Sequence, residues 1–358
     1  MRASFWVAAG LGIAASTSLP PRSAWAEAPL LEVQEVADTG SMPKGALLAR
    51  DGTRFFVTNF GNRNGGNVTV YDRETLKRLA TIDIPGIVVE SVLSPDGGTL
   101  YVSNFERNSV QTVDVATRRV KKEFPAGLHP KVMVLSGDGT KLFAANWSGE
   151  SVTEIDTATG KTIRTLPVGL HPRGMALARD GKLYVANFDG ESIDVFDGPE
   201  YGHTYRLAVC RIPRHLALSP DEKTLFISCY HDSEVHALDL ATELVTHTVK
   251  VGANPKSLEA SRDGRYVFTA DYGEDAHGFS VVDTTDWTAR IFSIPGMDRG
   301  SGIAVTPDGQ HALVTGWYDN HVYLVGFEGT GGHPVEALKR IQGWVHHAHY
   351  HPPKLPGE

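Results

Sequence analysis

The sequence has few cysteines, a modest share of charged residues and none of the short catalytic motifs that mark common enzyme classes. Two cysteines among 358 residues exclude a disulfide-built scaffold and a four-cysteine zinc module. No Walker loop, G-x-S-x-G, H-E-x-x-H or C-x-x-C-H sequence occurs, so a nucleotide kinase, an α/β-hydrolase and a c-type haem protein are poorly supported. Apolar residues make up 41% and charged residues 21% of the chain, a balance that allows a packed core.

The charge balance is acidic. Asp and Glu number 42 against 34 Lys and Arg, for a net charge of −8 with neutral histidines. Removal of a leader containing Arg2 and Arg22 would make this −10. Bulk charge of this sign argues against general nucleic-acid binding but leaves room for a local basic patch.

Residues 1–26 have the pattern of a secretory signal. Arg2 supplies the positive start, residues 5–15 are mostly apolar, and Ala24-Trp25-Ala26 matches a cleavage site. The apolar run is too short to span a bilayer of about 30 Å as a helix. We therefore expect cleavage after Ala26, a periplasmic or secreted location, and no transmembrane segment in the mature chain.

A sevenfold internal repeat predicts the fold. Each copy starts at an Asp, continues through an apolar strand and ends in an aromatic residue; the copies run 51–60, 96–105, 138–147, 180–188, 221–230, 263–272 and 308–317. Most begin with an Asp-Gly pair, which signals a tight turn between two strands. An apolar stretch precedes each Asp, and two further strand patterns follow each aromatic residue. Four strands per unit of about 42 residues predict an all-β, seven-bladed β-propeller of four-stranded antiparallel blades.

The second strand of the repeat carries a recurring tetrapeptide with Asn at its end. Its clearest copies are Phe56-Val-Thr-Asn59, Tyr101-Val-Ser-Asn104 and Tyr184-Val-Ala-Asn187. This pattern resembles the YVTN family of β-propeller repeat proteins, from residue 30 to about residue 343. The resemblance implies a fold shared by exported binding proteins, propeller subunits of amine dehydrogenases, lactonases and a streptogramin lyase. Later copies depart from it, with Cys229, Asp271 and Gly316 at the Asn position.

Two segments compete to complete the seventh blade. Residues 33–36 and residues 335–341 both match the pattern of an outermost strand. We expect the N-terminal strand to close the ring. The predicted organisation is a signal peptide at 1–26, the propeller at 27–343, and a His/Pro-rich tail at 344–358.

A basic collar is predicted around the channel mouth. The position seven residues before each repeat Asp begins the channel-lining strand, and it holds Lys44, Val89, Lys131, Arg173, Arg214, Lys256 and Ser301. Five converging cations predict a site for an anionic small molecule or an acidic partner protein. Alternatively, Glu90 and Asp271 near the same mouth neutralise the collar, or the side chains point between blades.

Histidines supply the candidates for metal binding and proton transfer. His129 and His171 lie in crossings between blades, and His346 and His347 belong to the tail; these four are the metal-ligand candidates. His215 and His231 are the acid/base candidates. No cofactor is predicted, and a divalent metal is left open.

Cys210 and Cys229 both fall at the top of blade five, so a disulfide between them is feasible in an oxidising compartment. The alternative is two separate thiols. The Asn residues that end the second strands are expected to be structural. The closing aromatics are expected to pack between neighbouring blades, with Trp147, Tyr230 and Trp317 as alternative pocket residues.

These features favour an exported binding or scaffold protein that engages an anionic ligand or a partner protein on its top face. One alternative is a propeller enzyme of the lactonase or lyase type that uses top-face histidines and basic residues. Another is a propeller subunit of a periplasmic redox complex. Fold alone does not choose among them.

Overall fold

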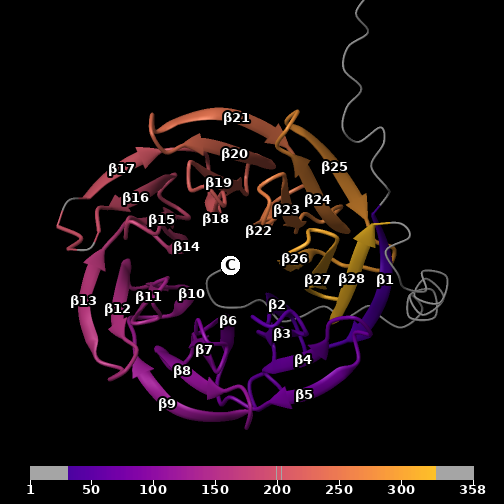
Figure 1. The fold of residues 1–358 in the computed structure, drawn as a ribbon, viewed down its shortest axis with the longest axis horizontal. Helices are drawn as coiled ribbons and strands as arrows, with labels where there is room; N and C mark the ends of the chain where they lie inside the picture. Colours follow the sequence, from indigo (N-terminus) through magenta and orange to yellow (C-terminus); the bar gives the residue numbers. More distant parts are fainter. Residues whose placement is uncertain (1–30, 199, 203, 328–358) are drawn as a thin grey trace, which may run out of the picture.

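Each repeat folds as one four-stranded antiparallel sheet, and seven such sheets stand around a central axis (Figure 1). The computed structural model describes residues 31–327 apart from residues 199 and 203. The predicted signal peptide, the predicted tail and the alternative closing segment 335–341 lie outside the described residues. The described residues contain no helical segment with the length and apolar character of a membrane span.

The first three blades follow the chain from the innermost to the outermost strand. Blade one contains β2 (Pro43–Leu48), β3 (Arg54–Asn59), β4 (Val68–Asp72) and β5 (Arg78–Ile82). Blade two contains β6 (Val88–Leu93), β7 (Thr99–Asn104), β8 (Ser109–Asp114) and β9 (Arg119–Pro125). Blade three contains β10 (Pro130–Leu135), β11 (Lys141–Asn146), β12 (Ser151–Asp156) and β13 (Thr162–Pro167).

The next three blades repeat this order. Blade four contains β14 (Pro172–Leu177), β15 (Leu183–Asn187), β16 (Ser192–Phe196) and β17 (Thr204–Ala208). Blade five contains β18 (Pro213–Leu218), β19 (Thr224–Cys229), β20 (Glu234–Asp239) and β21 (Leu244–Lys250). Blade six contains β22 (Pro255–Ala260), β23 (Tyr266–Asp271), β24 (Gly278–Asp283) and β25 (Thr288–Ser293).

Blade seven joins the two ends of the described chain. It contains β26 (Gly300–Val305), β27 (His311–Gly316), β28 (His321–Phe327) and β1 (Leu31–Asp38). The outermost strand β1 pairs antiparallel with β28, with Asp38 opposite His321 (Figure 1). The expected closure by the N-terminal strand is confirmed. Hydrogen bonds between the chain ends thus lock the ring and leave no blade with three strands.

The tight turns between the first and second strands explain the repeated Asp-Gly pairs. In six blades the turn glycine has a positive φ, for example 69° at Gly52 and 90° at Gly181. Only glycine adopts this backbone region without steric cost. Blade five has Glu222 at this position, with a φ of 56°, so its turn carries a side chain where the others have none.

The hydrophobic core is divided among the interfaces between blades. Between blades one and two, for instance, Phe56 and Val70 pack with Leu93 and Val102. Each of the other neighbouring blade pairs shares a comparable buried cluster among the described residues. Second strands such as β19 are almost wholly buried, whereas the outermost strand β9 is mostly exposed. Each blade therefore buries its apolar faces only against its neighbours, which makes closure of the ring important for stability.

Asn residues brace the loops at the top of the blades. Asn146 Nδ2 donates to Thr153 Oγ1 at 2.8 Å, and its Oδ1 accepts from the Gly127 backbone N–H at 3.0 Å. Asn59 similarly donates to Thr69 Oγ1 at 2.9 Å. These bonds hold the crossing between blades against the end of the second strand, as expected of a structural Asn.

Candidate functional site

Four of the five predicted collar residues converge on the axis. Each is the second residue of an innermost strand, and Lys44, Arg173, Arg214 and Lys256 line one narrow cavity there. The cavity has room for roughly one water molecule. The four side chains are buried, with exposed fractions of 6–8%. The structure therefore turns these cations inward to a common space.

Seven aromatic side chains form a ring around the same mouth. They are the residues that close the repeats, and their ring centroids lie 5.1–6.5 Å apart for six neighbouring pairs: Phe60–Phe105, Phe60–Trp317, Trp147–Phe188, Phe188–Tyr230, Tyr230–Tyr272 and Tyr272–Trp317. The seventh neighbouring pair, Phe105 and Trp147, is bridged by Lys131, whose Nζ lies 5.6 Å and 3.3 Å from the two centroids. These aromatic side chains do contact across blades, and together they surround the mouth.

The collar cations lie over the faces of these aromatic rings. Lys256 Nζ is 3.8 Å from the centroid of Tyr272 and 3.6 Å from that of Trp317. The guanidinium carbon of Arg214 is 4.6 Å from the centroid of Tyr230. Each such contact contributes about 0.5–1 kcal/mol where it is exposed and about 2 kcal/mol where it is shielded from water. Cation–π contacts thus offset part of the cost of burying like charges together.

Glu90 is the carboxylate that faces the buried cations. It lines the cavity with Lys44, Arg173 and Arg214. Burial raises the pKa of Glu90, while nearby Lys44, Arg173, Lys256 and Arg214 oppose that rise. Burial and the charge of Arg214 lower the pKa of Arg173 to about 9, against the opposing effect of Glu90. One carboxylate is therefore shared among four cations.

Asp271 does not neutralise the collar, contrary to the alternative interpretation. Its carboxylate accepts hydrogen bonds from Thr269 Oγ1 at 2.8 Å and Ser280 Oγ at 2.6 Å. Burial raises its pKa to about 7. It therefore takes the structural place of the Asn found in earlier blades, and it is absent from the lining of the axial cavity.

His215 lines the axial cavity as a neutral side chain. Its Nδ1 accepts a hydrogen bond from the Leu258 backbone N–H at 2.8 Å, across the boundary between blades five and six. Burial, together with Arg173 and Arg214, lowers its pKa to about 4. Its proton therefore resides on Nε2, and Nδ1 already has a partner. At neutral pH this imidazole can donate a hydrogen bond within the cavity.

The other described histidine candidates lie away from that cavity. His231 is half exposed and pairs with Asp232, its Nδ1 3.5 Å from Oδ1. His129 stacks on Phe105 at 4.1 Å, and its Nδ1 lies 2.8 Å from Ser148 Oγ. His171 likewise stacks on an aromatic ring, with an Asp partner.

These contacts do not gather His129 and His171 into a metal site. Within the described ranges, the only group of three or more close His, Cys, Asp or Glu donors is Cys210, Cys229 and His236. The other two predicted metal ligands, His346 and His347, lie outside those ranges.

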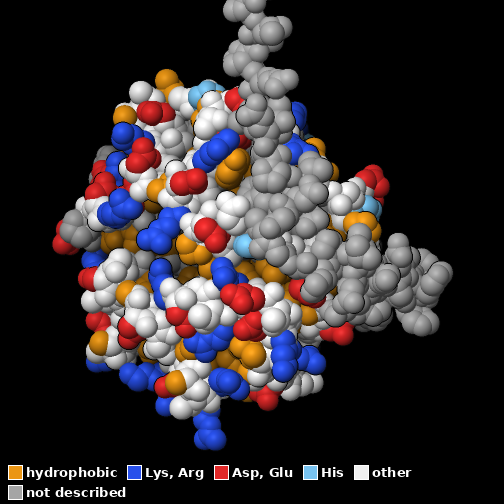
Figure 2. All heavy atoms as spheres, turned by 45° about the vertical axis from the view of Figure 1, so that its right-hand side comes forward, with side chains coloured by type: hydrophobic (Ala, Val, Ile, Leu, Met, Phe, Trp, Pro, Cys, Tyr) orange, Lys and Arg blue, Asp and Glu red, His pale blue; other side chains and the backbone are white. Residues whose placement is uncertain are grey.

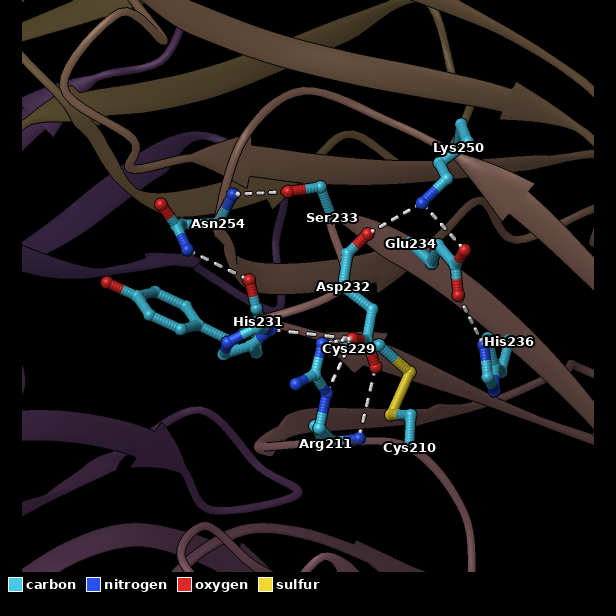
Figure 3. A network of polar contacts seen from close by, with 11 residues as sticks. Cys210, Arg211, Cys229, His231, Asp232, Ser233, Glu234, His236, Lys250 and Asn254 are labelled. Carbon is cyan, nitrogen blue, oxygen red and sulfur yellow. Dashed lines mark hydrogen bonds and ion pairs between the residues drawn. A yellow bond between two sulfur atoms is a disulfide. The ribbon is translucent and has the colours of Figure 1, made fainter.

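Cys210 and Cys229 are joined by a disulfide, with an S–S distance of 2.04 Å and a Cα–Cα distance of 5.8 Å. Figure 3 shows the bond with Arg211 and Asp232 on one side and His236 on the other. The disulfide ties the segment after β17 in blade four to the end of β19 in blade five. Of the two alternatives left open by the sequence, the structure contains the bonded pair.

Two residues that matter to these sites were missed or underrated by sequence reasoning. The sequence pattern marks Glu90 only as a neutralising group near the mouth, whereas the structure places it in the same cavity as four cations. His236 was not singled out at all. The strand alternation offered a signal for it, because Cys229 pairs with Glu234 across the sheet and residues two apart share a face.

On the face of the molecule that Figure 2 presents, the charged side chains are mixed in sign, with acidic and basic groups intermingled. An open surface groove also lies near Arg63, Asp83 and Glu106, where Arg63 and Glu106 form an ion pair at 2.9 Å. The axial cavity differs from this face and this groove in gathering cations around a single carboxylate.

Comparisons with known proteins support the fold more than an activity. No family model matches the chain. Antigen Lp49 of Leptospira interrogans is 25% identical over 228 residues, which is 57% of this chain and 50% of that protein. The 6-phosphogluconolactonase of Yersinia pestis is 25% identical over 108 residues, 28% of this chain and 32% of that protein. This chain therefore matches half or less of the length of each of these curated relatives.

A solved structure shares the architecture. A chain of Kuenenia stuttgartiensis hydrazine synthase superposes with a TM-score of 0.71 at 19% sequence identity. The match covers 82% of this chain and 97% of that one. At this identity the likeness shows the propeller fold.

Proposed function

We propose that this chain is an exported, YVTN-type propeller whose axial cavity binds an anionic group presented by a small molecule or a partner protein. The signal pattern of residues 1–26 supports export, and a disulfide suits an oxidising compartment. The tetrapeptides in the second strands support the YVTN assignment.

A single observation carries the binding proposal: four buried cations share one cavity with one carboxylate. Buried like charges repel strongly because little water screens them. Burial is the main cause of the lowered pKa of Arg173, and the charge of Arg214 adds to it. A bound anion would relieve the repulsion, and this relief is the physical source of affinity.

The size of the cavity limits what can enter it. Room for roughly one water molecule suits a terminal carboxylate or phosphate oxygen rather than a whole metabolite. The remainder of a ligand would rest at the mouth, which the seven aromatic side chains surround. Arg173 and Arg214 supply planar guanidinium donors that match carboxylate and phosphate geometry.

The test is a titration of the full-length protein with inorganic phosphate and with acetate. Binding is measured by tryptophan fluorescence and by the shift in the unfolding midpoint. We expect saturable binding that falls at least about tenfold in Arg173→Gln/Arg214→Gln, which corresponds to a loss of about 1.4 kcal/mol or more. The matched control is Arg119→Gln/Lys161→Gln, two exposed cations on the outer strand region. The proposal would be refuted if the protein bound neither phosphate nor acetate. It would also be refuted if Arg173→Gln/Arg214→Gln bound them as tightly as the unaltered protein does.

A second candidate function is hydrolysis of a phosphorylated lactone, favoured by the 6-phosphogluconolactonase relatives. In this candidate the collar cations hold the phosphate and Glu90 accepts a proton from water. The resulting hydroxide attacks the lactone carbonyl carbon, the ring C–O bond breaks, and the released oxygen takes the proton. His231 lies outside the cavity, and the Nδ1 of His215 is already hydrogen-bonded, so Glu90 fits this role better than either histidine.

Turnover of 6-phosphogluconolactone distinguishes this candidate from simple binding. We expect Glu90→Gln to lose most of the rate although its phosphate binding becomes tighter. No turnover by the unaltered protein, above the spontaneous rate, would eliminate the enzyme and leave the binding proposal standing.

A further inference from the structure

The disulfide has a histidine beside it that the proposed function does not use. The two sulfur atoms and a ring nitrogen of His236 all lie within 4.8 Å of one another. They come from three segments: Cys210 follows β17, Cys229 ends β19, and His236 is in β20. In Figure 3 the imidazole of His236 lies next to the yellow sulfur–sulfur bond.

The strand register explains why these donors meet. Cys229 pairs with Glu234 across the β19–β20 ladder, and His236 follows Glu234 by two residues. Side chains two residues apart lie on the same face of a strand, as do directly paired side chains. Cys229, Glu234 and His236 therefore share one face of blade five, and Cys210 reaches that face from the preceding blade.

One nitrogen of the His236 imidazole has a carboxylate partner, and the other has none. His236 Nε2 lies 2.9 Å from Glu234 Oε2, and Lys250 holds the other oxygen of Glu234 at 2.8 Å. An Nε2–H that donates to a carboxylate leaves the lone pair on Nδ1. That Nδ1 is buried and has no hydrogen-bond partner. A carboxylate behind a histidine is the common outer-shell arrangement at metal sites, where it fixes the tautomer and increases ligand basicity.

We propose that reduction of the Cys210–Cys229 disulfide converts this cluster into a two-cysteine, one-histidine site for a soft metal ion such as Cu⁺ or Zn²⁺. Two electrons and two protons from a dithiol reductant break the S–S bond and form two thiols, while the reductant becomes a disulfide. The metal then displaces both thiol protons to solvent and binds two thiolates and the neutral Nδ1. Soft thiolate ligands select these ions over Mg²⁺ or Ca²⁺.

The donor number sets the coordination. Three ligands complete a trigonal site for Cu⁺, and they leave one position of a tetrahedral Zn²⁺ for water or another ligand. Both cysteines are buried, with exposed fractions of 7% and 0%. Little rearrangement is needed, because the donors already lie together. The oxidised protein cannot form this site, since its sulfurs are bonded to each other.

The test uses Co²⁺ as a spectroscopic probe on the full-length protein, without oxygen, before and after reduction with dithiothreitol and removal of the reductant. Thiolate-bound Co²⁺ has a near-ultraviolet charge-transfer absorption that histidine-bound Co²⁺ lacks. The His-rich tail therefore cannot produce the signal. We expect one equivalent of thiolate-bound Co²⁺ in the reduced protein, none in the oxidised protein, and displacement by Zn²⁺.

Variants identify the third ligand and its support. His236→Gln should weaken Co²⁺ binding at least about tenfold, and Glu234→Gln about tenfold, as outer-shell losses do. The matched control is His247→Gln, an exposed histidine on β21 that stacks on Trp287 at 3.9 Å. Cys210→Ser/Cys229→Ser should abolish the charge-transfer signal.

The near-ultraviolet circular dichroism of the reduced protein shows whether the fold around the site survives reduction. A reduced protein that keeps its near-ultraviolet circular dichroism but gives no charge-transfer signal overturns the proposal, as does equal affinity in His236→Gln. If reduction alone abolishes the circular dichroism, Co²⁺ should restore it, because metal binding then drives refolding of the site. Failure to restore it also overturns the proposal.

Discussion

Replacing Asp271 with Asn tests how a buried carboxylate affects the stability of blade six. Asp271 ends the second strand, at the position that Asn occupies in blades one to four. It is 1% exposed, and burial raises its pKa to about 7 against the opposing hydrogen bonds from Ser280 and Thr269. Asn could keep both contacts, by accepting from Thr269 and donating to Ser280 as Asn146 donates to Thr153.

The sign of the pH effect follows from the raised pKa. Between pH 4 and pH 7 the carboxyl group of the unfolded chain has lost its proton, whereas that of the folded protein retains it. The folded state thus binds more protons, so the free energy of unfolding falls as pH rises through this range. A rise from 3.8 to about 7 corresponds to a total loss of about 4 kcal/mol above the folded pKa, at 1.36 kcal/mol per pKa unit. Asp271→Asn has no carboxyl group at this position, so its free energy of unfolding does not decrease in this way.

Urea unfolding at pH 5 and pH 8 measures the difference. We expect Asp271→Asn to be more stabilising at pH 8 than at pH 5 by about 2–3 kcal/mol. Asp275→Asn, at an exposed position of the same blade, should show no comparable change. Glu259, whose pKa burial also raises to about 7, contributes equally to both proteins and cancels. An equal effect of Asp271→Asn at the two pH values would show that ionisation of this carboxylate does not lower the free energy of unfolding.

Three further perturbations have defined outcomes. Glu90→Gln should tighten phosphate binding about tenfold in a calorimetric titration, because it removes a negative charge from the cation cluster; weaker binding would contradict the electrostatic account. Cys210→Ser/Cys229→Ser should lower the free energy of unfolding in urea by about 3 kcal/mol, since the bond closes a loop with a sequence separation of 19. An unchanged midpoint would show that the bond adds no stability. Deletion of the chain through Asp38 removes β1 and should abolish cooperative thermal unfolding, because β28 loses its outer partner; an unchanged unfolding midpoint would show that ring closure does not require it.

Local pattern was enough to predict the blades. The Asp-Gly turns require a positive φ, and the alternation of apolar residues matches strands that pack on neighbouring sheets. These are short-range requirements, so they can be read from each repeat separately. The same regularity placed the collar residues at equivalent positions, because every innermost strand starts at the same distance from its turn.

The sequence by itself therefore determined the number and strand composition of the blades and the placement of cations near the axis. The tertiary structure decided which charges meet. Glu90 faces four cations whereas Asp271 turns to Thr269 and Ser280, although the repeat pattern places both near the same mouth. It also brought His236 to the two cysteines. Such contacts depend on side-chain direction and on the junction between blades, where residues far apart in the chain meet. Strand alternation places Cys229, Glu234 and His236 on one face, but it does not say which side chain crosses from the neighbouring blade.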